Sequence, residues 1–261
     1  MEAQTRRARG LRQRLWHRLR PQLSRPLARL ARALLPPLQQ AYLRLVFATS
    51  KVDAAALRSA RDWAEQQGGL VGLFWHEEIY ALPYLCAREG IRVHALVGHG
   101  DAGDLVAAAL ERCGHVPIRG GASRRRSRRA PGLVHRLIAA LRESPGAILA
   151  LAVDGTHGPA HELKLGGLVV AREAGLPIAL VRVWFRRCLR LPTWDRLAIP
   201  LPWNEIRCWL EGPHAAPADA HSDAGLERWR AELERALAAQ ALRSYSEFGA
   251  SPPETLARSI G

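Results

Sequence analysis

Short apolar runs alternate with longer stretches of helical periodicity along the chain after about residue 50. Apolar runs bounded by turn-forming residues indicate buried strands, and apolar residues at every third or fourth position indicate helices. The predicted strands span residues 70–75, 93–97, 116–118, 147–153, 178–183 and 207–210. The predicted helices lie near residues 53–66, 77–88, 102–113, 131–142, 165–174 and 225–242. This alternation predicts an α/β fold with a largely parallel central sheet flanked by helices.

The first 47 residues carry a different pattern and are predicted to form a basic amphipathic helical segment, attached to an α/β domain over residues 48–261. The segment holds eleven arginines and one acidic residue, Glu2. Spacings of three and four place its leucines on one side of a helix, at Leu11, Leu15, Leu19, Leu23, Leu27, Leu30 and Leu34. Pro21 and Pro26 are expected to kink it. Such a helix, with Trp16 near its apolar side, suits an anionic lipid surface; the alternative is a helix that packs its leucines on the domain.

The composition indicates a globular protein with an anionic partner. Hydrophobic residues make up 48% of the 261 residues, which allows a sizeable core and excludes wholesale disorder. Of the 38 basic residues two are lysine, which leaves 36 arginines, and the net charge is +14. We expect an anionic membrane surface rather than nucleic acid, because the arginine runs at residues 6–14 and 124–129 contain no aromatic side chains apt for base stacking.

Cysteine usage and hydropathy bear on the compartment. The four cysteines form no C-x-x-C pair, which argues against a zinc ribbon or a disulfide scaffold and favours a reducing environment. No uncharged apolar stretch is long enough to span a bilayer, and the N-terminus lacks the apolar segment of a secretory signal. We therefore expect a cytoplasmic protein, peripheral at the inner face of the plasma membrane.

Polar and glycine-rich segments follow four of the predicted strands. Because the carboxyl ends of parallel strands meet at one edge of a sheet, these segments are expected to converge there. They are His76-Glu77-Glu78, residues 98–104, Arg119-Gly120-Gly121, and Asp154-Gly155-Thr156-His157-Gly158-Pro159. This edge of the sheet is the predicted place for chemistry.

The order of these segments resembles the lysophospholipid acyltransferase superfamily, and most closely a bacterial branch of it long labelled a domain of unknown function. That branch has Trp-His after the first strand, Arg-Gly before a Ser-rich loop, Asp-Gly-Pro-Arg-Gly-Pro, and Trp-Asp-Arg before Ile-Pro-x-Pro-Phe. The counterparts, within roughly residues 65–215, are Phe74-Trp75-His76, Arg119-Gly120-Gly121-Ala122-Ser123, Asp154-Gly155-Thr156-His157-Gly158-Pro159, Thr193-Trp194-Asp195-Arg196 and Ile199-Pro200-Leu201-Pro202-Trp203.

The resemblance implies a glycerolipid acyltransferase-like fold and an O-acyltransferase activity. The fatty acyl group would move from a coenzyme A (CoA) or acyl carrier protein (ACP) thioester to a hydroxyl of a lysophospholipid or lipid A-like acceptor. Acyl-CoA or acyl-ACP is then a co-substrate, and no bound cofactor is expected.

His76 is the predicted general base, because acyl transfer to a hydroxyl needs a group that takes up its proton. The superfamily places an aspartate five positions after this histidine, but position 81 here is Ala81. Glu77, Glu78 or Asp154 is therefore predicted to take the place of the missing acid.

His99 is the alternative base, because Asp104 follows it at that five-position spacing within a glycine-rich loop. We interpret this second match as coincidental and keep His76 as the leading prediction.

The predicted substrate-binding residues lie around the base. Arg119 corresponds to a superfamily arginine that resembles a phosphate holder, a role that suits a planar, permanently charged guanidinium. Glycines let backbone amides approach a ligand, which offers donors for an oxyanion. The remaining predicted residues of this group are Gly120, Gly155, Thr156, His157 and Asp101. The alternatives are a tight strand-to-helix turn at residues 154–159 and a helix cap at Asp101.

Three further expectations complete the sequence-based picture. No metal site is predicted, because Pro159 disfavours the regular helix that would place His157 and His161 on one face next to Glu162. The segments Trp194-Asp195-Arg196 and 199–203 are expected to be structural, with Trp203 alternatively lining an acyl groove. The competing function is a non-catalytic module on the same fold that binds anionic lipid or, less favoured, nucleic acid.

Overall fold

The computed structural model describes residue 30, residues 32–120 and residues 131–258. Its first helix covers residues 32–48, and residue 30 is also helical. The strands are β1 (Lys51–Asp53), β2 (Leu70–Phe74), β3 (Val93–Val97), β4 (Val116–Arg119), β5 (Ile148–Ala152), β6 (Ile178–Phe185), β7 (Cys188–Arg190), β8 (Ala198–Pro200) and β9 (Glu205–His214). The other helices are α2 (Ala55–Gln67), α3 (Leu82–Arg88), α4 (Asp101–Arg112), α5 (Pro131–Arg142), α6 (Gly166–Ala174), α7 (Asp223–Glu247) and α8 (Glu254–Arg258), with 3-10 turns η1 (His76–Glu78) and η2 (Ala218–His221).

Seven strands form one sheet in the order β1-β9-β6-β2-β5-β3-β4. The strands from β6 to β4 in this order all run parallel, while β9 runs antiparallel to β6 and parallel to β1. A separate hairpin pairs β7 with β8. The predicted α/β fold with a largely parallel central sheet is therefore confirmed.

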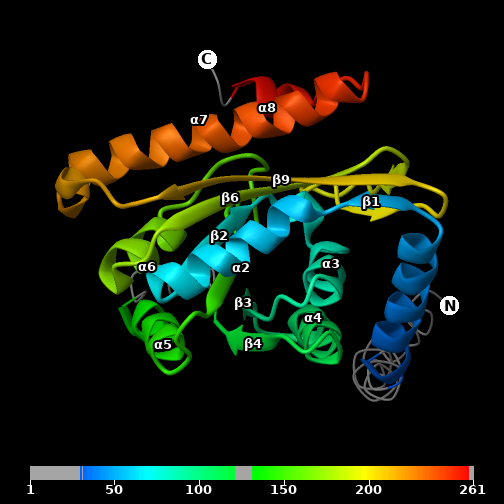
Figure 1. The fold of residues 1–261 in the computed structure, drawn as a ribbon, viewed down its shortest axis with the longest axis horizontal. Coiled ribbons are helices and arrows are strands. Elements are labelled where there is room, and N and C mark those ends of the chain that lie inside the picture. Colours follow the sequence, from blue (N-terminus) through cyan, green and yellow to red (C-terminus); the bar gives the residue numbers. More distant parts are fainter. Residues whose placement is uncertain (1–29, 31, 121–130, 259–261) are drawn as a thin grey trace, which may run out of the picture.

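The sheet is covered on both faces, as buried parallel strands require. Side chains of β2 alternate between the two faces: Val71 and Leu73 pack with α5, α6 and α7, whereas Leu70 and Phe74 pack with the first helix, α2 and α3. Figure 1 shows α7 and α8 on the side of the sheet away from α3 and the first helix. Because every residue of β2 is buried, the strand is a continuous apolar run.

The chain after β2 differs from the predicted helix over residues 77–88. Residues His76–Glu78 form a single 3-10 turn, and the regular helix α3 begins only at Leu82, with Pro83 in its first turn. Proline fits the first turn of a helix, where its missing N–H leaves no helical hydrogen bond unmade. His76 and Glu77 therefore precede the helix and are directed by tertiary contacts.

The described part of the basic N-terminal segment contributes to the core of the domain. Leu43, Val46 and Phe47 are buried and belong to the same apolar cluster as α2 and α3. Leu30 and Leu34, in contrast, are 56% and 49% exposed. The other leucines of the predicted stripe and the arginine run at residues 124–129 lie outside the described residues. Within the described chain, no helix is both long and apolar enough to cross a bilayer.

Candidate active site

The parallel strands bring the predicted site residues to one edge of the sheet. His76 follows β2, Asp154 follows β5, Asp101 opens α4 after β3, and Arg119 ends β4. Since β5 and β3 lie between β2 and β4, three inter-strand spacings of ~4.8 Å separate the backbones of β2 and β4 by about 14 Å. His76 and Asp154 follow adjacent strands, whereas Arg119 ends β4, the outermost strand on this side of the sheet.

The imidazole of His76 is held by a carboxylate that sequence reasoning did not select. Its Nδ1 lies 2.7 Å from Oδ2 of Asp195, in the loop between β7 and β8. The other oxygen of Asp195 accepts the backbone N–H of Leu197 at 3.4 Å. Because an ionised carboxylate only accepts hydrogen bonds, Nδ1 carries the hydrogen and Nε2 keeps the lone pair of a base.

The His76–Asp195 pair is partly shielded from water. The side chains of His76 and Asp195 are 17% and 8% exposed. The indole of Trp194 covers the imidazole, with ring centroids 5.0 Å apart. Low exposure strengthens the interaction between a carboxylate and an imidazolium that forms during proton transfer.

Asp154 binds the backbone of the site and not the imidazole. Its Oδ1 accepts the N–H of His76 at 2.8 Å, and its Oδ2 accepts the N–H of His161 at 3.3 Å. Burial raises the pKa of Asp154 to about 6, while the N–H of His76 and its imidazole act in the opposite direction. Asp154 therefore fixes where the turn that bears His76 begins.

Glu77 and Glu78 point away from His76 into the protein. Both carboxylates contact the guanidinium of Arg182, a β6 residue whose side chain is 1% exposed. Glu77 also contacts Arg190 at 2.5 Å, and Glu78 accepts the N–H of Val183 at 2.8 Å. These contacts differ from the sequence-based prediction that Glu77 or Glu78 holds the imidazole, because the buried Arg182 requires both carboxylates as partners.

The two buried carboxyl groups differ in their pKa. Burial alone would raise the pKa of Glu77, but the charges of Arg182 and Arg190 lower it to about 2. Burial raises the pKa of Glu78 to about 7, with a further contribution from the negative charge of Glu77. Glu77 is thus the permanent counterion of this buried network.

The same network connects the segment that carries His76 with the hairpin that carries Asp195. Glu77 lies directly after His76, and its partner Arg190 is the last residue of β7, at the start of the loop that holds Asp195. The ion pair therefore holds the 3-10 turn η1 against the β7–β8 hairpin. The ion pair thereby stabilises the contact between His76 and Asp195, which are 119 positions apart in the chain.

The loop after β5 packs against the loop after β7. Gly158 has a φ of +71°, and a Cβ at this position would lie 2.6 Å from Cε3 of Trp194. Only glycine allows this close approach without displacing the indole. Gly155 also has a φ of +71°, and the exposed Thr156 hydroxyl and His157 Nδ1 are 2.7 Å apart.

Arg119 is held at the far side of the edge by acidic and carbonyl oxygens. Its guanidinium donates to the carbonyl of Gly98 at 3.1 Å and to Asp104 at 2.7 Å. Asp104 and Asp101 both pair with Arg32 of the first helix, at 2.9 and 2.5 Å. The N-cap of α4 is Gly100, and Asp101 is the first helical residue, so its carboxylate contacts Arg32 instead of capping the helix.

Gly120 has a packing role at its place after β4. A Cβ there would lie 2.3 Å from Cδ1 of Leu133 in α5 and 3.0 Å from Cδ1 of Leu96. The glycine therefore allows α5 to approach the sheet behind Arg119.

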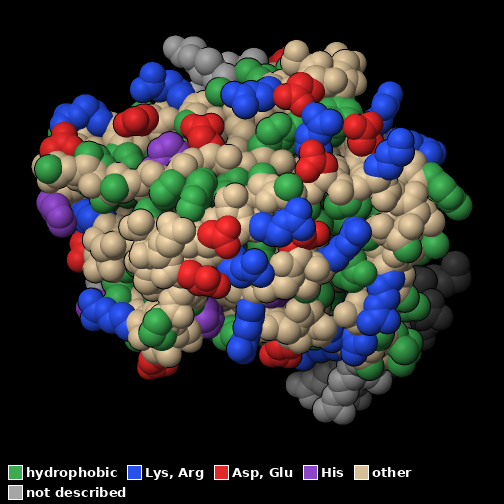
Figure 2. Space-filling view, viewed as in Figure 1, with side chains coloured by type: hydrophobic (Ala, Val, Ile, Leu, Met, Phe, Trp, Pro, Cys, Tyr) green, Lys and Arg blue, Asp and Glu red, His purple; other side chains and the backbone are tan. Residues whose placement is uncertain are grey.

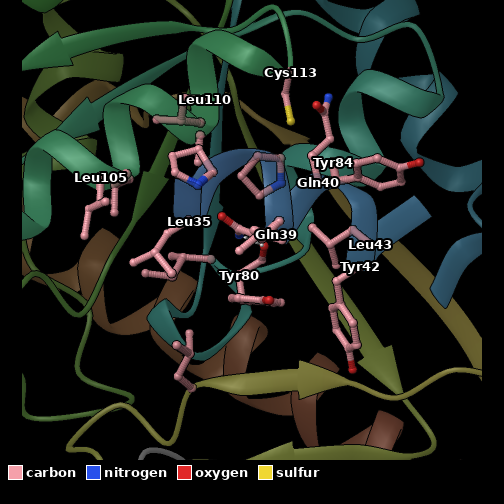
Figure 3. A pocket seen from close by; sticks show the side chains of 17 residues that line it. Leu35, Gln39, Gln40, Tyr42, Leu43, Tyr80, Tyr84, Leu105, Leu110 and Cys113 are labelled. Carbon is pink, nitrogen blue, oxygen red and sulfur yellow. Dashed lines mark hydrogen bonds between the residues drawn. The ribbon is translucent and has the colours of Figure 1, made fainter. Parts of the chain in front are cut away.

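An apolar groove of about 510 Å³ lies between the first helix, α3 and α4. Figure 3 shows Leu35, Tyr80, Leu105 and Leu110 around it. Its wall also includes Ile79, which follows η1 directly, and Leu197, two residues after Asp195. The groove thus extends toward both segments that carry the His76–Asp195 pair.

Two residues of this site were missed for different reasons. Asp195 belongs to Trp194-Asp195-Arg196, which the sequence predicts to be structural, since no local spacing relates Asp195 to His76. Arg182 did give a signal, because an arginine inside an otherwise apolar strand needs buried acidic partners. The described residues contain no cluster of three or more histidine, cysteine or acidic side chains arranged to hold a metal ion.

The sheet and this edge define an α/β protein with a histidine–aspartate pair at the carboxyl ends of parallel strands. No family model matches the chain. Among curated proteins, it is 26% identical over 180 residues to the uncharacterized protein RP090 of Rickettsia prowazekii (strain Madrid E), covering 68% of this chain and 79% of that protein.

Among solved structures, the chain is similar to the 1-acyl-sn-glycerophosphate (LPA) acyltransferase PlsC from Thermotoga maritima. The two share 14% sequence identity with a TM-score of 0.45, over 85% of this chain and 83% of the other. Similarity at this level carries no argument by itself, so the functional conclusion rests on the geometry of the site.

Proposed function

We propose that this protein is an O-acyltransferase that moves a fatty acyl group from an acyl-CoA or acyl-ACP thioester to a hydroxyl of a lysophospholipid or lipid A-like acceptor. The observation that carries the proposal is the His76–Asp195 pair, 2.7 Å apart. The apolar groove of about 510 Å³ includes in its wall Ile79 and Leu197, which follow the two members of the pair closely in the chain. A shielded base next to an apolar binding space suits proton removal from a hydroxyl during transfer of a long acyl chain. The proposed partner is the anionic inner face of the plasma membrane.

His76 is the base in the proposed reaction. Its Nε2 takes the proton of the acceptor hydroxyl while the hydroxyl oxygen attacks the carbonyl carbon of the thioester. The carbon–sulfur bond of the resulting tetrahedral intermediate then breaks, and the leaving thiolate receives the proton from the imidazolium. Asp195 keeps the imidazole in the required tautomer and stabilises its transient positive charge, the role that the sequence-based prediction gave to Glu77, Glu78 or Asp154.

The groove and the flanking polar residues receive the substrates in this proposal. The apolar walls near Ile79 and Leu197 take up the acyl chain. Arg119 binds the acceptor phosphate, with its guanidinium oriented by Asp104 and by the carbonyl of Gly98.

The turn after Asp154 supplies donors in the proposed transition state. Its positive φ at Gly155 turns the backbone at the carboxyl end of β5, and the amides of Gly155 and Thr156 are assigned to the developing oxyanion. His157 and Asp101 are the polar side chains that we assign to the mouth of the site. Both are exposed at this edge of the sheet.

The structure removes the reason for the alternative, a non-catalytic lipid-binding module. That alternative arose because position 81 is Ala81, so no acid stands at the usual distance after His76. Asp195 supplies an acid from another part of the chain, and the contact is as short as a charge-assisted hydrogen bond.

The test uses the full-length protein with palmitoyl-CoA and lysophosphatidate. Product lipids are measured by mass spectrometry, and free CoA is measured in parallel with a thiol reagent. We expect one acylated lipid for each CoA released, only when the acceptor is present. A panel of other hydroxyl lipids, with acyl-ACP as a second donor, then ranks the substrates.

Two outcomes would refute the proposal. CoA release that is independent of the acceptor would identify a thioester hydrolase. No acylated product with any acceptor and either donor, from protein that still binds anionic lipid, would return the binding module as the function.

A further inference from the structure

The first helix is apolar on two opposite sides. Leu43, Val46 and Phe47 point into the core and are at most 3% exposed. At 100° per residue, a second set of leucines falls within an arc of about 80° on the opposite side. This set is Leu30, Leu34, Leu38 and Leu45, with exposed fractions of 56%, 49%, 61% and 49%. The described part of the domain therefore leaves about half or more of each of these leucine side chains exposed.

Trp203 is a further exposed apolar residue, close to the end of the first helix. Its side chain is 70% exposed and its φ is +53°, a backbone conformation that costs free energy for a bulky residue. The N–H of Trp203 donates to Thr49 Oγ1 at 3.1 Å, and the N–H of Asn204 donates to Ser50 Oγ at 3.0 Å. These bonds tie the strained turn to the residues that directly follow the helix. Strain of this kind points to a role outside folding.

Arginines flank this set of leucines and the tryptophan. Arg44 is exposed on the first helix, and Arg187 donates to the carbonyl of Trp203 at 3.4 Å. Arg186 is exposed beside it. Figure 2 shows hydrophobic and basic side chains together over the end of the molecule that holds the first helix. Leucine, tryptophan and arginine in this arrangement match the acyl chains, the interfacial zone and the phosphates of a bilayer.

We propose that this leucine face, made of Leu30, Leu34, Leu38 and Leu45 with Trp203 at its end, docks on an anionic lipid bilayer. Leu38 also lines the apolar groove, so the groove opens on the same side of the molecule. A second copy of the chain is a poorer occupant, because a net charge of +14 repels another copy and attracts anionic headgroups. The inference deepens the proposed function by naming the surface where a lipid substrate is met.

The test compares binding of full-length variants to sedimented vesicles. Vesicles contain phosphatidylcholine alone or with phosphatidylglycerol. The variants are Leu34→Gln/Leu45→Gln and Trp203→Asn, since asparagine tolerates a positive φ. The matched control is Leu165→Gln, an exposed leucine at the start of α6 that is not part of the leucine face.

We expect the wild type to bind anionic vesicles more strongly than neutral ones. The double variant should lower the partition coefficient by at least about tenfold, because two leucines no longer leave water on docking. Trp203→Asn should lower it several-fold, and the control should stay within about twofold. Melting temperatures should not change in the double variant, since both leucines are exposed.

Two results would overturn the inference. Unchanged vesicle binding by the double variant would do so at once. Unchanged vesicle binding together with a shift from dimer to monomer, measured by light scattering, would assign the leucine face to a second copy. Neither result depends on acyl transfer, so failure of this inference and failure of the proposed activity are distinguishable.

Discussion

The substitution Asp195→Asn removes one negative charge from the pair while it preserves the shape of the loop. The amide oxygen of asparagine still accepts the N–H of Leu197, which Asp195 does at 3.4 Å. At Nδ1 of His76, however, the asparagine amide group donates a hydrogen bond. Donation to Nδ1 favours the tautomer with hydrogen on Nε2, which has no lone pair there to act as a base.

The size of the effect follows from the distance and the shielding. An imidazolium and a carboxylate with charge centres about 4 Å apart attract by ~4 kcal/mol at an effective dielectric constant of about 20. That value applies because the two side chains are only 17% and 8% exposed. Loss of ~4 kcal/mol of transition-state stabilisation lowers the rate by about 10³-fold.

The assay is the initial rate of acceptor-dependent CoA release, with kcat and KM measured for both substrates. We expect Asp195→Asn to lower kcat by about 10²–10⁴-fold with little change in either KM, since the pair acts in the chemical step. Combined with His76→Ala, it should add little further loss, because the two residues act as a unit.

The matched control is Asp62→Asn, which removes a charge from an exposed aspartate of α2. It should leave the rate within about twofold of the wild type. The reasoning fails if Asp195→Asn keeps more than a third of wild-type kcat while His76→Ala is inactive. It also fails if the two variants multiply their losses in the double variant.

Three further predictions concern the surroundings of the pair. Arg119→Ala should raise the KM for a phosphate-bearing acceptor by about tenfold or more and change kcat less, since one charge-assisted contact is lost; steady-state kinetics with and without the acceptor phosphate checks this. Burial lowers the pKa of His161 from 6.5 to about 4, so its neutral form stabilises the fold above pH 6.5 and that contribution is lost as pH falls through 4. The difference in unfolding free energy between wild type and His161→Asn should therefore shrink by ~3 kcal/mol from pH 6.5 to 4 in urea titrations, and a constant difference would refute the assigned cause. Gly158→Ala should displace Trp194 from the imidazole and lower both kcat and the melting temperature, whereas Gly249→Ala, also at a positive φ but with open space around it, should lower only the melting temperature.

The central strands could be predicted from the sequence because their burial requires apolar residues at consecutive positions. A parallel strand covered on both faces is a continuous apolar run, as residues 70–74 illustrate, and residues 178–185 form such a run interrupted only by Arg182. The short strands β1 and β7 have only three residues each, and β7 is partly exposed, so no such run marks them. The edge of the sheet that carries His76 and Asp154 followed from the same parallel topology.

The partner of His76 could not be predicted in the same way. Its contact with Asp195 depends on how a hairpin packs on the sheet, and local spacing carries no information about that packing. The prediction that Glu77 or Glu78 holds the imidazole is wrong because side chains that are adjacent in sequence can point in different directions. Arg182 inside an apolar strand was the available indication that these carboxylates face inward.

The central claim is that His76 acts as a base in acyl transfer from a thioester to a lipid hydroxyl. The most direct measurement is acylated lipid formed from palmitoyl-CoA and lysophosphatidate by wild type and His76→Ala, at equal concentrations of folded protein. The account predicts a fall in kcat of about 10²–10⁴-fold with acceptor binding retained. Equal product formation by the two proteins would contradict it.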